Sequence, residues 1–216
     1  MALDTVVRET GAEPTGTVIW LHGLGADGHD FEPIVPELGL AEPIRFVFPH
    51  APVRPVTVNG GMAMRAWFDI KSLDRNGDVD KQGIDESCAG IDALVAAEIE
   101  NGIPPDRIVL AGFSQGGVIA MHTALRAPDD YAGLMVLSSY LPLAARLSTY
   151  PDKANLPVFV AHGDFDPMLP LPLGEAIRDT LTASGLSPQW HHYPMAHAVC
   201  PQEIADISQW LSDIYA

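Results

Sequence analysis

The residue types best suited to chemistry in this sequence are a serine, an aspartate and a histidine, which follow one another in its second half. Ser114 lies in a G-x-S-x-G pattern between Gly112 and Gly116. The pattern follows an apolar run and opens a segment rich in small residues, which is typical of a sharp strand-to-helix turn that presents a nucleophile. The two glycines leave room for neighbouring backbone, and the start of a helix favours developing negative charge on the serine oxygen.

A serine hydroxyl needs a general base in order to attack, and the base needs an acidic partner that orients it. With a turn of this kind the usual chain order is serine, acid, histidine. His197 fits the base, because it lies between the last expected strand and the last expected helix. His191 and His192 fall inside the strand pattern and His122 falls on the helix after the turn, where structural roles are favoured. We expect activity to fall as His197 becomes protonated below neutral pH.

Two carboxylates compete for the role of the acid. Asp164 and Asp166 both lie in the segment His162–Pro167, at the end of a run that reads as a buried strand. We favour Asp166, because it lies further out in the loop. Asp164 is then expected to form the turn by bonding local amides, which is a common role of aspartate in such a place.

Glycines also follow the first expected strand, at Gly23, Gly25 and Gly28. Such residues let backbone N–H groups face the oxygen of a substrate. We expect an oxyanion hole made by the N–H of Gln115, the residue after the nucleophile, and by the N–H of Leu24.

Short apolar runs alternate with longer helical patterns along the chain. The runs lack polar alternation, as expected of parallel strands that are buried on both faces. They are Thr17–Leu21, Arg45–Phe48, Arg107–Ala111, Gly133–Leu137 and Pro157–Ala161, with Gln189–Tyr193 nearer an edge. Helices are expected from Ile84 to Ile99, from Gly116 to before Pro128, from Leu173 to Ser184 and from Pro201 onward. This alternation predicts an α/β fold, with a mostly parallel central sheet and helices on both faces.

The length of 216 residues fits a single α/β domain over residues 1–216, with no room for a large lid domain. The irregular stretch from Pro49 to Asp85 is rich in proline, glycine and asparagine. We expect it to form loops over one end of the sheet, near the site. The exposed apolar residues between Pro49 and Ile70 would suit a homodimer or a substrate groove.

The formal net charge of −16 disfavours nucleic acid as a partner, because such a surface repels phosphate backbones. No signal peptide and no apolar run of about 20 residues is present, so we expect no stable membrane insertion and a cytoplasmic location. Cys88 and Cys200 are expected to be reduced thiols. The histidines form no HExxH or other ligand pattern, so we expect neither a metal nor an organic cofactor.

From Val18 to Leu211 the chain resembles the bacterial carboxylesterase and acyl-protein thioesterase (phospholipase/carboxylesterase) family of small α/β-hydrolases. The resemblance rests on six motifs in a fixed order: Leu21–Asp27, Phe48–Pro52, Met64–Ile70, Gly112–Gly117, His162–Pro167 and Met195–Val199. It implies a triad of Ser114, Asp166 and His197, with Leu24 and Gln115 as oxyanion donors. It also implies that Trp67 belongs to a loop that flanks the acyl pocket.

Among substrate-binding residues we place Trp67, Phe113, Met168 and Leu169. The chain departs from the family pattern at Ala196, Ala198 and Met168–Leu169, which affects the shape of the pocket and not the catalytic groups. The expected function is a serine carboxylesterase that acts on short to medium acyl esters. The alternatives are an acyl-protein thioesterase or lysophospholipase with the same triad and, more remotely, an inactive hydrolase-fold binding protein.

Overall fold

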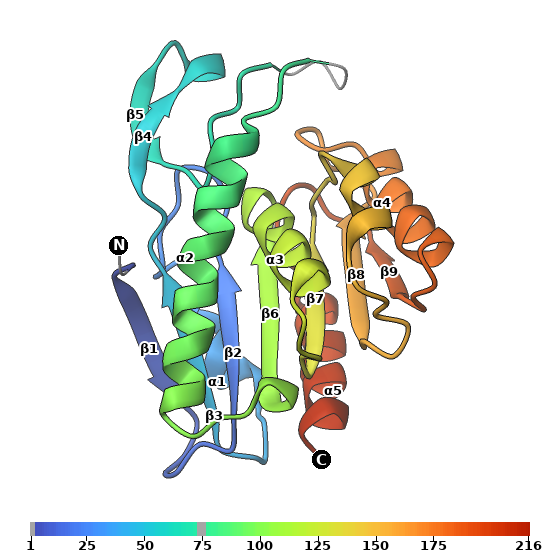
Figure 1. Ribbon diagram of the computed structural model, residues 1–216. Helices are drawn as coiled ribbons and strands as arrows, with labels where there is room; N and C mark the ends of the chain where they lie inside the picture. Colours follow the sequence, from blue (N-terminus) through green and yellow to red (C-terminus); the bar gives the residue numbers. More distant parts are fainter. Residues whose placement is uncertain (1–2, 73–76) are drawn as a thin grey trace.

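A computed structural model describes residues 3–72 and 77–216, which are built around a twisted seven-stranded sheet (Figure 1). The strand order is β1-β3-β2-β6-β7-β8-β9, and among the described strands of this sheet only the edge strand β1 pairs in the antiparallel direction. The strands are β1 (Thr5–Glu9), β2 (Gly16–Leu21), β3 (Ile44–Pro49), β6 (Ile108–Phe113), β7 (Gly133–Leu137), β8 (Val158–Gly163) and β9 (Gln189–Tyr193). The predicted α/β-hydrolase architecture is therefore confirmed.

Helices cover both faces of this sheet. On one face lie α2 (Lys81–Glu100), α3 (Gln115–Arg126) and α4 (Pro172–Ala183), and on the other lie α1 (Val35–Leu38) and α5 (Pro201–Tyr215). Successive residues of β2 point to opposite faces of the sheet. Ile19 packs in the core under α2, α3 and α4, and Trp20 packs in the core under α1 and α5. Burial on both sides explains why the central strands are apolar without alternation.

Two features differ from the sequence prediction. The stretch from Pro49 to Asp85, expected to be loops, contains an antiparallel hairpin of β4 (Val53–Val56) and β5 (Met62–Arg65). Strand β1 was not expected either. Each of these strands has only four or five residues and much exposed surface, so each lacks the apolar run that marks the central strands. Residues 73–76 of the expected loop lie outside the described residues.

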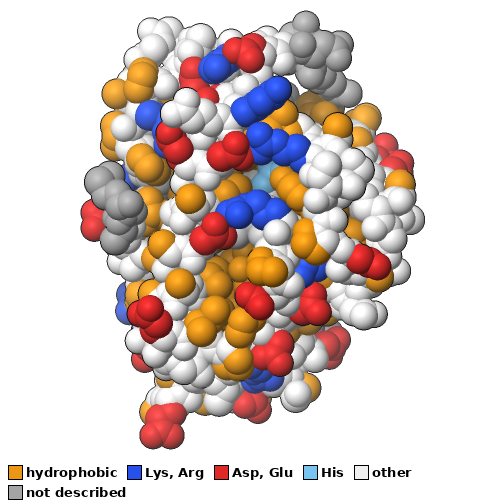
Figure 2. Space-filling view, viewed as in Figure 1, with side chains coloured by type: hydrophobic (Ala, Val, Ile, Leu, Met, Phe, Trp, Pro, Cys, Tyr) orange, Lys and Arg blue, Asp and Glu red, His pale blue; other side chains and the backbone are white. Residues whose placement is uncertain are grey.

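The parallel strands all end at the upper edge of the sheet in Figure 1, where α2, α3 and α4 begin. Lys and Arg side chains gather over the upper half of the face covered by α2 and α3, whereas Asp and Glu side chains are spread over the whole of it (Figure 2). The few cations of this acidic chain are therefore not evenly distributed on that face.

Neither cysteine takes part in a disulfide, in agreement with the expectation from sequence: Cys88 is buried and Cys200 is half-buried. In the described ranges, no helix combines the length and the apolar character needed to cross a membrane.

Candidate active site

The turn between β6 and α3 holds Ser114 in a backbone conformation with φ 53° and ψ −119°. A non-glycine residue pays of the order of 1–3 kcal/mol for such a conformation, so the surroundings must hold it. They do so through three hydrogen bonds. The Ser114 N–H donates to Leu137 O at 2.9 Å, and its carbonyl accepts from the Gly117 N–H at 3.0 Å and from Ser139 Oγ at 2.7 Å.

The two glycines of the pattern have the steric role that the sequence suggested. A Cβ atom on Gly112 would overlap the carbonyl of Gly116, and one on Gly116 would overlap the carbonyl of Leu21 at the end of β2. Only glycine allows the turn to lie this close to the neighbouring strand.

The structure brings Ser114, His197 and Asp166 together from three different loops. His197 Nε2 lies 3.0 Å from Ser114 Oγ, and His197 Nδ1 lies 2.6 Å from Asp166 Oδ2. A carboxylate accepts, so Nδ1 carries the proton in this arrangement and Nε2 is left to accept from the serine hydroxyl. The Asp166 side chain is fully buried, whereas that of His197 is 20% exposed. Of the three hydrogen-bonded side chains Asp166, His197 and Ser114, the acid is thus shielded from solvent and the histidine is partly accessible to it.

The loop after β8 holds the Asp166 carboxylate through a second pair of contacts. Its Oδ1 accepts from the N–H groups of Met168 and Leu169, each at 2.8 Å. Asp164 does not form these local bonds, and in this respect the sequence-based expectation was wrong. Its Oδ1 instead lies 2.7 Å from Nδ1 of His192 on β9, so it pairs across the sheet edge.

The loop that carries His197 is packed against the acid loop. The N–H of Phe165 donates to Met195 O at 3.0 Å, and that of Asp164 donates to Tyr193 O at 2.8 Å. A Cβ atom on Gly163 would overlap the carbonyls of Met195 and Ala196. Close backbone contact therefore fixes the distance between the acid and the histidine.

The two N–H groups expected to form an oxyanion hole belong to Leu24, in the loop after β2, and to Gln115, the first residue of α3. Within the described ranges, neither the Leu24 N–H nor the Gln115 N–H donates to any other group. The loop of Leu24 is anchored on both sides, since the Gly25 N–H donates to Arg65 O at 2.9 Å and His22 Nδ1 donates to Gly23 O at 2.7 Å. Burial lowers the pKa of His22 to about 4, so this imidazole is neutral at pH 7.

Trp67 lies behind that loop and not on a surface. Its side chain is fully buried, and its indole N–H donates to His22 O at 2.9 Å. Its backbone N–H donates to Oε1 of Gln115 at 2.8 Å, and Nε2 of Gln115 donates to Phe68 O at 2.8 Å. The structure thus corrects the expectation that Trp67 contacts substrate: Trp67 supports the loop that carries Leu24 from inside the fold. Sequence reasoning missed the Gln115 side chain, because no local pattern marks a contact across 48 residues.

The remaining residues expected to bind substrate lie at the same end of the sheet, but their side chains differ in how much of their surface is exposed to solvent. Phe113 is almost buried, and its ring lies 4.7 Å from the His197 ring. Met168 is 70% exposed beside the acid, together with its neighbour Phe165 at 69%, while Leu169 is half-buried.

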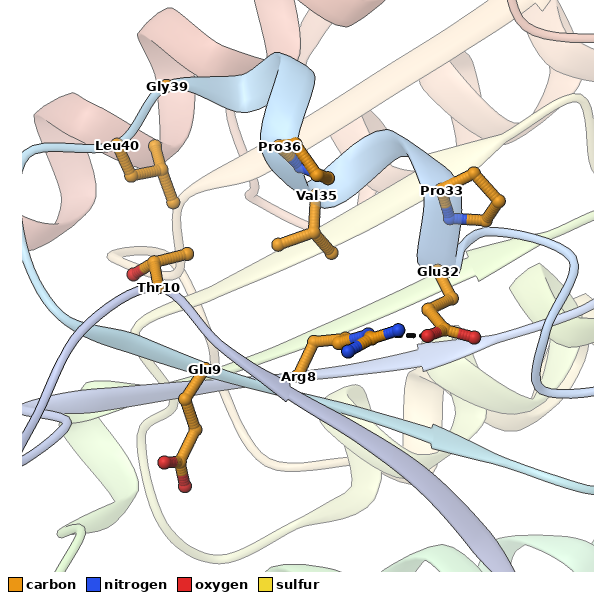
Figure 3. Close-up of a pocket in the computed structure, with 9 residues that line it drawn as sticks. All are labelled: Arg8, Glu9, Thr10, Glu32, Pro33, Val35, Pro36, Gly39 and Leu40. Atoms are coloured by element: carbon orange, nitrogen blue, oxygen red, sulfur yellow. Dashed lines mark hydrogen bonds and ion pairs between the residues drawn. The ribbon is translucent and has the colours of Figure 1, made fainter.

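A large hollow of about 720 Å³ lies elsewhere, between strand β1 and the segment that contains α1 (Figure 3). Of its three charged residues, Arg8 and Glu32 are paired with each other, and Glu9 is paired with Arg45. No serine, cysteine or histidine lines it. Nor do the described residues contain a group of three or more His, Cys, Asp or Glu side chains arranged to hold a metal ion.

Comparison with protein families gives an independent result. A model of the phospholipase/carboxylesterase family matches residues 3–215. The chain is 38% identical to acyl-protein thioesterase 1 of Cryptococcus neoformans over 92% of both sequences. It is also 38% identical to acyl-protein thioesterase 1 of Mycosarcoma maydis, over 95% of this chain and 93% of that one.

Solved structures agree in fold over almost the whole chain. Acyl-protein thioesterase 2 of Zea mays superposes with a TM-score of 0.85 at 28% identity, over 99% of both chains. SOBER1 of Arabidopsis thaliana superposes with a TM-score of 0.87 at 29% identity, over 93% of this chain and 99% of that one. These comparisons bear on fold and family, and they do not show the bacterial source that the resemblance suggested.

Proposed function

Because the chain belongs to the phospholipase/carboxylesterase family of α/β-hydrolases, and is therefore a hydrolase of ester or thioester bonds, we propose that it is an acyl-protein thioesterase with Ser114 as its nucleophile. The observation that carries the proposal is the His197 ring, which bridges Ser114 Oγ and Asp166 Oδ2. The substrate class follows the relatives at 38% identity, which are named for thioester hydrolysis. They favour the thioesterase over the carboxylesterase that the sequence alone suggested.

In the first half of the proposed reaction, Ser114 Oγ attacks the carbonyl carbon of the thioester. His197 Nε2 takes the hydroxyl proton, and Asp166 stabilises the imidazolium that results. The negative charge moves to the former carbonyl oxygen, which accepts from the Leu24 and Gln115 N–H groups. Collapse of this intermediate breaks the carbon–sulfur bond and leaves the acyl group on Ser114 as an ester.

The leaving group is a cysteine thiolate, which takes the proton from His197. A thiol has an ordinary pKa near 8.5, so its thiolate leaves with less help from a general acid than an alkoxide would need. In the second half, His197 activates a water molecule that attacks the acyl-enzyme. The acid is released and Ser114 regains its proton, so that no metal or organic cofactor enters the cycle.

Hydrolysis of a peptide that carries a palmitoyl thioester, compared with p-nitrophenyl esters of increasing chain length, tests the proposal. We expect turnover of the thioester peptide and a rise in rate with acyl length, both abolished by Ser114→Ala. Turnover confined to short oxygen esters would favour the carboxylesterase. A folded wild type that turns over none of these compounds and does not react with a fluorophosphonate would favour the binding protein.

A further inference from the structure

A buried histidine beside the proposed acid takes no part in the relay described above. His162 lies at the end of β8, four residues before Asp166, and its side chain is fully buried. Its Nε2 lies 2.6 Å from Leu169 O. A carbonyl only accepts, so Nε2 carries the proton and donates it to the loop that holds the Asp166 carboxylate.

The other ring nitrogen of His162 has no partner in the described part of the chain. It faces the backbone of α4, where a Cβ atom on Gly174 would lie 2.6 Å from Nδ1. A proton on Nδ1 would be a buried donor without an acceptor, which is unfavourable. Burial lowers the pKa of this imidazole, and the Leu169 carbonyl and Asp166 oppose that effect without overcoming it. The ring is thus held neutral with its one proton on Nε2.

That proton connects His162, through the Leu169 peptide, to Oδ1 of the Asp166 carboxylate. Leu169 accepts it through its carbonyl and donates its own N–H to Asp166 Oδ1 at 2.8 Å. His162 Nε2 also lies 3.7 Å from Oδ2, the oxygen that accepts from His197. Two charged or titratable groups shift the pKa of His162, namely Asp166 and His197. On the side of α4 the ring faces Gly174, which has no charged side chain.

The geometry points to His162 as a positioning residue for the acid: its Nε2–H fixes the Leu169 peptide, and through it the direction of the Asp166 carboxylate toward His197. The inference rests on the proposed function, because it assigns His162 a role only if the Asp166–His197 pair is catalytic. A carboxylate that rotates away would leave the imidazolium of His197 less stabilised. His197 would then hold its proton less tightly.

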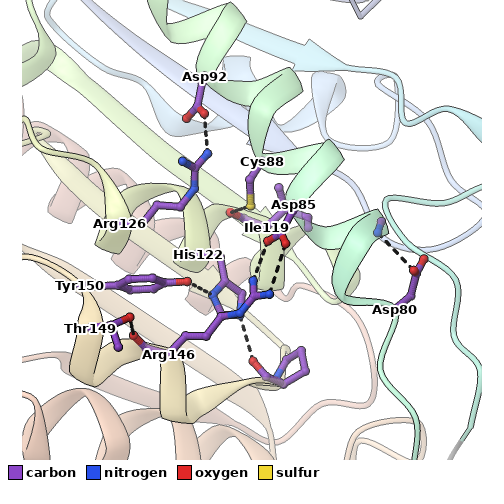
Figure 4. A network of polar contacts seen from close by, with 12 residues as sticks. Asp80, Asp85, Cys88, Asp92, Ile119, His122, Arg126, Arg146, Thr149 and Tyr150 are labelled. Carbon is purple, nitrogen blue, oxygen red and sulfur yellow. Dashed lines mark hydrogen bonds and ion pairs between the residues drawn. The ribbon is translucent and has the colours of Figure 1, made fainter.

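The chain contains a matched control in His122 on α3 (Figure 4). This imidazole is also buried, and its Nε2 lies 2.9 Å from Pro142 O in another loop. Its Nδ1 lies 3.0 Å from the Tyr150 hydroxyl, and burial lowers its pKa as well. Both histidines thus tie a loop carbonyl to the core, but the loop at His122 carries none of the three triad residues.

The test is the pH dependence of kcat and KM for hydrolysis of p-nitrophenyl butyrate by wild type, His162→Leu, His162→Gln, His162→Asn and His122→Leu. We expect His162→Leu to lower kcat by about 10- to 100-fold, since a displacement of about 1 Å at the reacting groups costs that much. KM should stay within about threefold of wild type. The acid limb of the profile should move to lower pH by about half a unit, because His197 loses part of the stabilisation of its cation.

The two amide variants separate positioning from mere loss of packing. The side-chain amide introduced by His162→Gln reaches the place of Nε2 and should restore most of kcat and the wild-type acid limb. The amide introduced by His162→Asn is one methylene shorter and should restore neither. His122→Leu should lower the melting temperature and leave both kcat and the profile unchanged. If His162→Leu does not fold, the two amide variants carry the comparison.

Equal kcat and equal profiles for His162→Gln and His162→Asn would overturn the inference, as would an unshifted profile in a folded His162→Leu. A wild type that turns over neither the ester nor the palmitoyl thioester peptide, or that does so equally well as Ser114→Ala, overturns the proposed function and the inference with it. The two failures are therefore distinct.

Discussion

The two ends of the central sheet use buried polar groups in different ways. At the amino end of the strands, Glu98 on α2 accepts from Thr17 Oγ1 at 2.7 Å with one oxygen and from Arg45 Nε at 3.2 Å with the other. The Tyr215 hydroxyl donates to Thr17 O at 2.8 Å. Every one of these groups is satisfied by a neighbour within the fold, so these groups stabilise the structure.

At the carboxyl end, successive hydrogen bonds connect Asp166 to His197 and His197 to Ser114. Both oxygens of Asp166 accept hydrogen bonds, and one of these bonds holds the His197 ring. The series ends at Ser114 Oγ; Ser114 is half-buried, and its backbone is strained. Beside it the N–H groups of Leu24 and Gln115 have no acceptor in the described part of the chain. Within the described residues, the carboxyl end is thus the one where N–H donors without an acceptor lie beside a serine hydroxyl that is bonded to His197. The large hollow at β1 has volume but lacks this convergence.

The largest effect should come from Ser114→Ala. With the nucleophile gone, we expect ester turnover to fall by at least about 10⁴-fold, measured with p-nitrophenyl butyrate. Ser212→Ala is the matched change at the amino end, since that residue is exposed and its hydroxyl donates to Ser208 O of the same helix. It should leave turnover within about twofold of wild type. A Ser114→Ala enzyme with wild-type turnover would show that the carboxyl end is not the reactive one.

The next effect separates two carboxylates at the same end. Asp166→Asn should lower kcat by about 10⁴-fold, because an amide cannot hold His197 in the required tautomer. Asp164→Asn removes only the partly exposed pairing with His192 and should change kcat by less than about threefold. The opposite order of effects would mean that Asp164 orients the histidine in solution.

At the amino end, Glu98→Ala should act on stability alone. Loss of this buried carboxylate leaves Thr17 Oγ1 unpaired and removes a partner of the partly exposed Arg45. We expect a loss of about 3 kcal/mol in the free energy of unfolding, measured in urea, with kcat/KM unchanged. A loss of activity without a loss of stability would remove the distinction between the two ends.

The smallest expected effect concerns Glu203, in the first turn of α5. Its side chain is buried, and neither oxygen forms a hydrogen bond to another described residue. Burial raises the pKa of this carboxyl to about 8, and the nearby Asp206 carboxylate acts in the same direction. The folded state therefore keeps its proton over a range in which the unfolded chain, with an ordinary pKa of 4.5, has lost it.

The contribution of Glu203 to the free energy of unfolding is therefore greatest below about pH 4.5. This contribution declines as pH rises toward 8. Between about pH 6 and pH 8 we expect the free energy of unfolding of wild type to lose about 2 kcal/mol more than that of Glu203→Gln. Urea unfolding at the two pH values measures the difference. Parallel curves for the two proteins would mean that Glu203 is ionised in the folded state.

Much of this arrangement is visible in the sequence, because local rules govern it. The central strands are apolar on both faces, the elbow needs Gly112 and Gly116, and the positions of Asp166 and His197 follow from where strands end. Burial of Trp67 against His22 and pairing of Asp164 with His192 depend on contacts between distant segments, which no spacing encodes.

His162 lies between these cases. A histidine at the end of an apolar strand must find a partner when it is buried, and this signal could have drawn attention to it. Its partner, Leu169 O, depends on the path of the acid loop, which only the structure shows.

The central claim is that Ser114 is the nucleophile at the carboxyl end of the sheet. Labelling by a fluorophosphonate, followed by peptide mass spectrometry, tests it most directly. We predict a single adduct on the peptide that contains Ser114, absent from Ser114→Ala and formed much more slowly in His197→Ala and Asp166→Asn. An adduct on another residue, or labelling of Ser114→Ala at the wild-type rate, would contradict the account.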